Sequence, residues 1–215
     1  MSEMAAIITT LRIARVVSRG AIVVLVAGMF MVVAVSASAD PIAYRIDRDA
    51  TQVEYVARAL GVIEARGRFT DVRGSIVLDR EIAQGDIDFE IDARSVDSGW
   101  ILRDAFVRGE PMLDAVRHPL IRFRSSRVTF VDGRLTGIEG LLTLRGVTRH
   151  IALAVTEIAC DGRSNGESAD CAARAVANIK RGAFGMESYA PWVGDDVELS
   201  FVVVAHRVPE TGTGP

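Results

Sequence analysis

The larger part of the chain, from Tyr44 to His206, consists of short runs in which apolar and polar residues alternate. In one run Ile87, Phe89 and Ile91 alternate with acidic residues, which places apolar side chains on one face of a strand and charged ones on the other. Each such run predicts a half-buried β-strand. The apolar positions of the other runs are Val53, Tyr55 and Ala57; Ile121, Phe123, Val128 and Phe130; Ile151, Leu153 and Val155; and Val197, Leu199, Phe201, Val203 and Ala205.

Turn-forming residues separate these runs. About seven to nine strands joined by short turns, with few helices, are typical of a β-barrel or a β-sandwich. No linker and no internal repeat divides the chain, so we expect one all-β domain over residues 40–208. The predicted turns lie at Asp71–Gly74, Gln84–Asp86, Asp132–Gly133, Gly146 and Gly194–Asp195.

One segment, residues 98–124, breaks the alternation and predicts a helix. Four apolar residues in it recur at helical spacing, and charged residues occupy the other positions. An apolar helical face needs a cavity or a sheet surface to pack against. The residues that share this face are Ile101, Leu102, Ala105 and Phe106.

Gly109 is expected to end that helix, and Pro111 suits the first position of a second short helix. Pro119 would end the second helix, after which the period of two returns. The segment is therefore predicted to be a short helical insertion in an otherwise β-structured domain. The apolar residues of the second helix would be Met112, Leu113 and Val116.

The N-terminal residues 1–39 predict a secretory signal peptide. Arg12, Arg15 and Arg19 precede an unbroken apolar run, and small residues precede Asp40, the expected new N-terminus. The run has about 15 residues, fewer than the roughly 20 that a membrane-spanning helix needs. We expect export and no stable membrane span after cleavage, with a membrane anchor as the alternative if the segment is retained. Residues 209–215 predict a polar, disordered tail.

Composition and charge narrow the range of functions that the chain could have. The chain is 49 % hydrophobic with a mean hydropathy of +0.25, and this excess is concentrated in the leader. Without residues 1–39, 22 basic and 27 acidic residues remain, a net charge of −5 with no basic patch. Nucleic-acid binding is not expected for such a chain.

The two cysteines fit an exported protein. Cys160 and Cys171 flank a polar turn between two strand-like runs. In an oxidising compartment they are expected to form a disulfide, which would stabilise the fold by about 3 kcal/mol on the chain-entropy model. Neither C-x-x-C spacing nor a neighbouring histidine suggests a redox or metal site.

Catalytic chemistry is not expected. No nucleophile motif, phosphate-binding loop or pair of histidines at metal-ligand spacing occurs. Three carboxylates share one strand face, but that face is the polar outside of an amphipathic strand. The three histidines are His118, His150 and His206. The three carboxylates are Asp88, Glu90 and Asp92.

Binding is left as the main possibility. Small residues at inward positions can leave a channel in a barrel of about eight strands, although they can equally let two sheets pack closely. If there is a channel, Trp100, Ile101, Phe106 and Met112 would close one end as a lid. Arg103 and Arg108 could then meet a polar head group, or Arg103 could pair with Asp104. The small inward residues are Ala57, Ala59, Gly61, Ala93 and Ala177.

Seven segments that cover most of residues 44–201 resemble YceI-like proteins. The resemblance implies an extended, lipocalin-like antiparallel β-barrel with a helical insertion, periplasmic export, and a long isoprenoid or other amphiphile in the channel. Where members of that family often carry histidine, this chain has Ala59 and Phe106, so we expect a more apolar lid. The segments are YRID…TQVEYVARALG (44–61), RGRFTDVRGSIVLD (66–79), RSVDSG (94–99) with RDAFVRGEPMLDAVRHPLIRFRSS (103–126), GLLTLRGVTRHIALAV (140–155), IKRGAFGM (179–186) and VGDDVELSF (193–201).

The expected ligand is therefore a polyisoprenoid, a quinone-type molecule or another long-chain lipid, with no further cofactor and no metal. The alternative is an interaction or stress-response module with a packed barrel, whose apolar outer positions Val202 and Val204 could pair with a partner or with a second copy in a homodimer. The candidate ligand-binding residues are Tyr55, Phe69, Phe89, Ile91, Trp100, Ile101, Arg103, Phe106, Met112, Leu113, Phe123, Leu142, Phe184, Met186 and Phe201.

Overall fold

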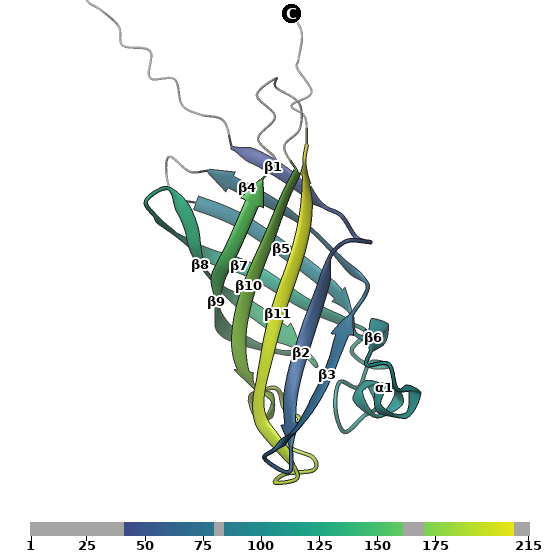
Figure 1. The fold of residues 1–215 in the computed structure, drawn as a ribbon. Coiled ribbons are helices and arrows are strands. Elements are labelled where there is room, and N and C mark those ends of the chain that lie inside the picture. The colour runs from purple at the N-terminus through teal and green to yellow at the C-terminus, as the bar shows by residue number, and fades with distance from the viewer. Residues whose placement is uncertain (1–40, 80–83, 161–169, 209–215) are drawn as a thin grey trace, which may run out of the picture. The chain divides into compact units, whose positions relative to one another are not determined.

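The computed structural model describes residues 41–79, 84–160 and 170–208 (Figure 1), so the predicted leader and tail lie outside the described residues. Within these ranges the strands belong to one sheet, and one α-helix and two 3₁₀-helices interrupt them. The strands are β1 (Ile42–Ile46), β2 (Gln52–Ala59), β3 (Ile63–Phe69), β4 (Val72–Asp79), β5 (Gln84–Asp92), β6 (Val96–Asp97), β7 (Leu120–Val131), β8 (Arg134–Leu144), β9 (Val147–Cys160), β10 (Asp170–Lys180) and β11 (Val193–Arg207). The helices are η1 (Ala93–Ser95), α1 (Ile101–Arg108) and η2 (Arg181–Phe184).

The sheet closes into a barrel along β11. On one edge β11 pairs with β10, and on the other it pairs first with β2 and then, near its end, with β1. β1 leads into β2, β3 into β4, and β5 through η1 into β6, so these six short strands fill three positions of the barrel. With β7 to β11 this makes eight antiparallel positions. The predicted all-β, lipocalin-like barrel with a short helical insertion is confirmed.

The bend between β1 and β2 is secured by side chains that replace the strand ladder. The buried Thr51 hydroxyl accepts from the Val204 amide at 3.0 Å and donates to the Val204 carbonyl at 3.2 Å. The Asp47 amide donates to the same carbonyl at 2.8 Å. These bonds satisfy the backbone amide and carbonyl of Val204 in the part of β11 that pairs with neither β1 nor β2. The barrel therefore stays closed across the bend.

The predicted alternation of inward and outward side chains is confirmed. Apolar positions such as Ile87, Phe89 and Ile91 are buried in the core. On the outer face of the same strand the carboxylates pair with the arginines of β7. Asp88 lies 2.7 Å from Arg124 and Glu90 lies 2.8 Å from Arg122. These acidic residues are an ion-paired outer surface, as the strand pattern predicts.

Some predicted turns are right and others are strand residues. Asp132–Gly133 and Gly146 do form turns with positive φ. In contrast, Gln84–Asp86 lies in β5 and Gly194–Asp195 in β11, so those turn predictions are wrong. Gly85 is glycine because of packing, since a Cβ atom there would lie 2.8 Å from Val128 Cγ1. A glycine that permits close approach has the same sequence signature as a glycine in a turn.

The structure also corrects the predictions for one further turn and one core position. Of Asp71–Gly74, only Asp71 lies in the break between β3 and β4, and Gly74 is inside β4 against the backbone of Asp88. Gly61, expected to face inward, lies in the β2–β3 turn with a φ of +74°. A side chain is disfavoured at that backbone conformation, which explains glycine there.

The disulfide between Cys160 and Cys171 is confirmed. The two residues face each other at the paired ends of β9 and β10, with their Cα atoms 4.1 Å apart. The residues between them, 161–169, lie outside the described part of the chain.

The helical insertion differs from its prediction in two respects. α1 forms and ends before Gly109, but the expected second helix is wrong, because residues 110–117 form turns. Asp114 has a φ of +48°, a left-handed backbone that interrupts a helix. Its carbonyl accepts the amides of Arg117 and His118 instead.

The orientation of α1 is also opposite to the prediction, because its apolar face points to solvent. Asp104 is the buried residue of the helix, and its carboxylate accepts from the Ser98 amide at 2.8 Å and the Ser98 hydroxyl at 2.6 Å. Arg108 donates to the Val96 carbonyl at 3.2 Å. Polar contacts to the preceding segment therefore fix the orientation of the helix.

A histidine joins three strand ends at the closure of the barrel. His206 of β11 lies 2.7 Å from Asp170 of β10 and 3.1 Å from Asp47, which follows β1. Hydrogen bonds to Asp170 and Asp47 raise the pKa of His206 above its usual 6.5. The hydrogen bond from His206 also lowers the pKa of Asp47.

These shifts predict a stability that depends on pH. A folded-state pKa above the unfolded one means that the stabilisation is fully present below about pH 6.5 and is lost as the pH rises through the folded-state pKa. His206→Gln should therefore lower the midpoint of urea unfolding at about pH 5.5 and have a smaller effect at about pH 8.5. His150→Gln, on the exposed outside of β9, is the control. Equal effects of His206→Gln at both pH values would contradict the prediction.

Candidate ligand-binding site

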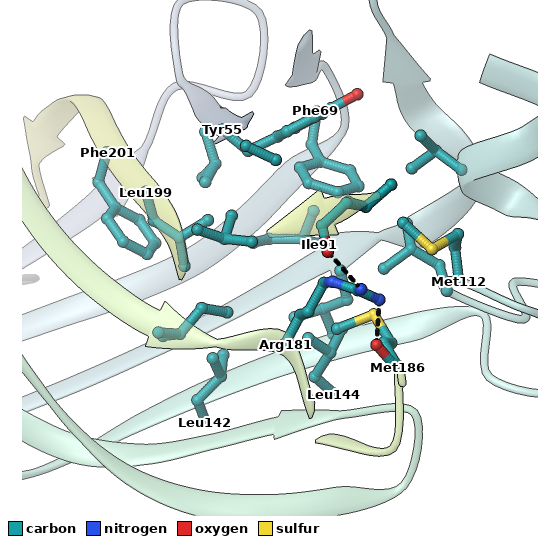
Figure 2. A pocket seen from close by; sticks show the side chains of 18 residues that line it. Tyr55, Phe69, Ile91, Met112, Leu142, Leu144, Arg181, Met186, Leu199 and Phe201 are labelled. Atoms are coloured by element: carbon teal, nitrogen blue, oxygen red, sulfur yellow. Dashed lines mark hydrogen bonds between the residues drawn. The ribbon is translucent and has the colours of Figure 1, made fainter. Parts of the chain in front are cut away.

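The barrel encloses an apolar cavity near the helical insertion, here called the insertion-end cavity (Figure 2). It has a volume of about 100 Å³. Its walls come from the strands around β2 and β11, from the inner side of α1 through Val107, and from the turn that follows α1. Its lining residues are Val53, Tyr55, Ala57, Phe69, Ile91, Val107, Met112, Leu113, Ile121, Leu142, Leu144, Ile179, Arg181, Met186, Val193, Val197, Leu199 and Phe201.

A second cavity of about 340 Å³ lies toward the other end of the barrel, where Cys160 and Cys171 form part of its wall. We call it the disulfide-end cavity. Aliphatic and aromatic side chains dominate its lining, with Tyr44 and Arg134 among the few polar residues. The strand residues in both linings are mainly inward-facing positions of the barrel.

Phenylalanine rings separate the two cavities. Phe201 lines both of them. The Phe89 ring lies 6.5 Å from the Phe201 ring and 6.5 Å from the Phe123 ring, measured between centroids. Gly140 leaves room for the Phe123 ring, since a Cβ atom there would lie 2.5 Å from Phe123 Cζ. The lumen is thus two chambers in series with an aromatic layer between them.

Arg181 introduces a buried positive charge at the insertion-end cavity. Its guanidinium donates to the carbonyls of Gly194 at 2.9 Å, Val193 at 2.8 Å, Ser188 at 2.9 Å, and Met186. Figure 2 shows the side chain among the apolar lining residues. Burial of a cation is costly unless hydrogen bonds satisfy it, and here four backbone carbonyls do so. The residue ties η2 to the loop that leads into β11.

Tyr55 contributes the other polar group near this cavity. Its ring lies over Gly67 of β3, where a Cβ atom would lie 2.5 Å from the tyrosine oxygen. The hydroxyl is buried and has no hydrogen-bond partner among the described residues. Burial raises the pKa of Tyr55, so the hydroxyl is protonated and can donate a hydrogen bond.

The structure brings together about half of the sequence-predicted ligand residues. Phe89 lines the disulfide-end cavity, whereas Phe123 and Phe184 are buried in the core without lining either cavity. The predicted residues that line the insertion-end cavity are Tyr55, Phe69, Ile91, Met112, Leu113, Leu142, Met186 and Phe201.

The predicted lid is divided between the inside and the outside of the barrel. Met112 lines the cavity, but Trp100, Ile101 and Phe106 lie on the exposed side of the insertion. Arg103 donates from Nε to the Ser98 hydroxyl at 3.0 Å and lies over the Trp100 ring at 5.6 Å, so it neither pairs with Asp104 nor lines a cavity. The inner side of α1 contributes Val107 instead, a residue that the helical pattern did not single out.

Arg181 was also missed by sequence reasoning. It lies inside the quoted segment 179–186, two residues after Ile179, which is the last inward residue of β10. A charged residue that follows an amphipathic strand normally indicates a turn at the surface. Only its burial against carbonyls of a later loop reveals its role.

The sequence was also compared with known protein families and proteins. The sequence profile of the YceI-like domain matches residues 44–205. The chain belongs to the YceI-like family. A UPF0312 protein of Pectobacterium carotovorum is 31 % identical over 113 residues, which cover 51 % of this chain and 58 % of that relative, so the chain matches less than two thirds of its length.

Two solved structures have a similar fold. BcnA of Burkholderia cenocepacia has a TM-score of 0.60 and 25 % identity, covering 74 % of this chain and 98 % of its own. A polyisoprenoid binding domain from Saccharophagus degradans has a TM-score of 0.57 and 18 % identity, covering 78 % of this chain and 99 % of its own. At that identity the likeness shows the fold alone. The predicted family is confirmed.

None of the helices within residues 41–79, 84–160 and 170–208 is both long and apolar enough to cross a membrane. No group of three or more His, Cys, Asp or Glu side chains in the same ranges could hold a metal ion.

The carbonyl cluster around Arg181 predicts a large effect of a conservative substitution. Arg181→Lys should lower the free energy of unfolding by about 3 kcal/mol, because a single ammonium cannot reach four carbonyls that a planar guanidinium spans. Urea unfolding measures this. Arg174→Lys, on the exposed side of β10 with one long contact to Ser200, should cost less than about 0.5 kcal/mol. Equal stability of the two variants would refute the assigned role of Arg181.

Proposed function

We propose that this protein holds a long apolar ligand, a polyisoprenoid or a similar amphiphile, inside its barrel, and that it carries or stores this ligand without catalysis. The observation that supports the proposal is the pair of cavities with largely apolar walls, placed in series inside one closed barrel. Such a lumen suits a chain-like molecule better than a compact polar one.

Apolar burial alone can supply useful affinity. Each buried methylene group contributes about 0.8 kcal/mol, and micromolar binding needs about 8 kcal/mol. About ten such groups would reach that value before the cost of ordering the ligand is subtracted. A polyisoprenoid offers many more than ten, so no strong polar contact is required.

The size of the cavities indicates how a long chain would fit. Small-molecule pockets typically have volumes of about 300–1,000 Å³. The disulfide-end cavity falls at the lower end of this range, and the insertion-end cavity is smaller. A longer chain therefore has to occupy both cavities, which requires the Phe201 side chain to move aside. In this proposal Phe201 sets the length of chain that the barrel accepts.

The exposed walls of the two cavities support an orientation for an amphiphile. The insertion-end cavity exposes only apolar atoms, because backbone carbonyls take up the guanidinium of Arg181 and the hydroxyl of Tyr55 is buried. The disulfide-end cavity exposes some polar atoms as well, and its lining includes Tyr44 and Arg134. The polar head group of an amphiphile would therefore lie toward the disulfide end, and its apolar tail would extend past Phe201 into the insertion-end cavity.

Two other lines of reasoning agree with this proposal. The Saccharophagus degradans domain, which has a similar fold, is described as polyisoprenoid binding. The predicted leader, residues 1–39, would deliver the barrel to the periplasm, and the disulfide suits an oxidising compartment.

The alternative of an interaction module through Val202 and Val204 has less support. Both residues are half-buried rather than exposed. β11 is paired on both edges, so it offers no free edge for a partner strand over its paired residues.

Substitution of Phe201 tests the proposed path of the ligand. Phe201→Ala should join the two cavities and increase affinity for long polyisoprenols about tenfold relative to short ones, because the longer tail gains burial. Leu199→Ala, which enlarges the insertion-end cavity only, should leave this length preference unchanged. Binding is measured by titration with polyisoprenols of defined length.

Lipid extraction from the purified protein, followed by mass spectrometry, tests the function directly. A long-chain lipid bound to the protein isolated from a bacterial envelope is the expected result. An empty barrel that also shows no saturable binding of any polyisoprenol would refute the proposed function.

A further inference from the structure

Exposed apolar side chains gather at the insertion end of the barrel. Figure 1 shows that the β2–β3 turn and the start of β11 lie together at this end, with α1 beside them. Soluble proteins rarely expose large contiguous apolar patches without a function. Three segments supply the side chains, and we call their exposed surface the insertion-end surface.

The first segment is the β2–β3 turn, which carries Leu60, Val62 and Ile63. Val62 is 82 % exposed, and the other two are more than half exposed. The Leu60 amide donates to the Trp192 carbonyl at 2.7 Å, so the turn is fixed against the loop that leads into β11.

The second segment is that loop. Trp192 is 65 % exposed, and Tyr189 is about half exposed. The Tyr189 ring meets the Phe106 ring of α1 edge to face, with centroids 5.0 Å apart. The loop therefore connects the β2–β3 turn to the helix, and the apolar surface is continuous across the three segments.

The third segment is the start of α1. Ile101 is 78 % exposed, Leu102 67 % and Trp100 55 %. The buried Asp104 and its bonds to Ser98 hold the helix with this face outward. The exposure is thus a consequence of well-ordered polar contacts.

We propose that the insertion-end surface docks the barrel on the surface of a lipid bilayer. The side chains project from three separate loops or helix ends and are packed against little of the protein. Fluid lipid accommodates such projecting side chains without a matching shape, whereas a protein partner must supply one. Tryptophan and tyrosine are also the residues that membrane interfaces favour.

The placement of the surface supports a bilayer as the occupant. The segments that carry it on the outside also line the insertion-end cavity on the inside, through Val107, Met186 and Val193. A docked barrel would therefore hold this cavity close to the lipid. The inference goes beyond the proposed function, because docking can be measured whatever the barrel contains.

The charges near the β2–β3 turn are balanced. Arg58 lies 3.8 Å from Glu64, and Arg66 pairs with the same carboxylate. Glu54 and Glu198 also act electrostatically on Arg66. The tip therefore has no positive excess, and its attraction to a bilayer would come from the apolar side chains.

Intrinsic fluorescence can report on this surface alone. The chain has two tryptophans, Trp100 and Trp192, and both belong to the insertion-end surface. Neither lines a cavity, so filling the barrel should not alter their emission. The chain from residue 40 is used, because the apolar leader would itself bind vesicles. All strand pairings of the barrel lie within residues 42–207, so this chain contains the whole barrel.

The experiment adds vesicles of phosphatidylethanolamine and phosphatidylglycerol to this chain. We expect the tryptophan emission to shift to shorter wavelength, to be quenched by brominated lipid, and the protein to float with the vesicles. The double variant Val62→Ser, Leu102→Ser should bind the vesicles about tenfold more weakly. Val131→Ser, an exposed apolar residue at the β7–β8 turn, is the matched control and should bind like the unchanged chain.

Three outcomes would overturn the proposal. One is the absence of both the emission shift and flotation. Another is a shift that depends on protein concentration without vesicles, together with a dimer by light scattering, which would assign the surface to a second copy. The third is equal weakening by Val131→Ser. Lipid found inside the barrel despite any of these results would leave the proposed function standing.

Discussion

The pairing of β11 with β10 on one edge, and with β2 and β1 on the other, closes the barrel, and the interior exists because of this closure. β1 and β2 meet β11 as two short strands, so the chain must bend between them. Thr51 and Asp47 bond to Val204 at the bend and supply the hydrogen bonds that a continuous strand would have made. Inward side chains are thereby withdrawn from water on every side, which lets an apolar lumen form without exposed strand edges.

The two ends of the lumen differ in chemistry. The insertion-end cavity exposes only apolar atoms, since the guanidinium of Arg181 is bonded to backbone carbonyls and the hydroxyl of Tyr55 is buried, whereas the disulfide-end cavity also exposes polar atoms. The aromatic layer around Phe201 lies between them. An amphiphile has the same asymmetry, with a polar head and an apolar tail, so the barrel provides a direction as well as a volume.

The barrel was largely predictable from the sequence, because period-two alternation is a local pattern that closure does not change. The Cys160–Cys171 bond was predictable because the two cysteines flank one polar turn between two strand-like runs, which become the paired strands β9 and β10. The orientation of α1 was not, because a tertiary contact of Asp104 with Ser98 outweighs the apolar face of the helix. Gly85 was read as a turn although it serves close packing, and the carbonyls that surround Arg181 come from a loop that no local pattern connects to it.

The attachment of α1 through its polar inner side has an evolutionary consequence. Asp104 and Arg108 hold the helix in place, whereas the outward side chains of Ile101 and Leu102 contribute little to the packing of the barrel. Substitutions at those outward positions therefore escape the selection for stability that constrains the core. The outer face of the helix can therefore change in sequence while the residues that build the lumen stay the same.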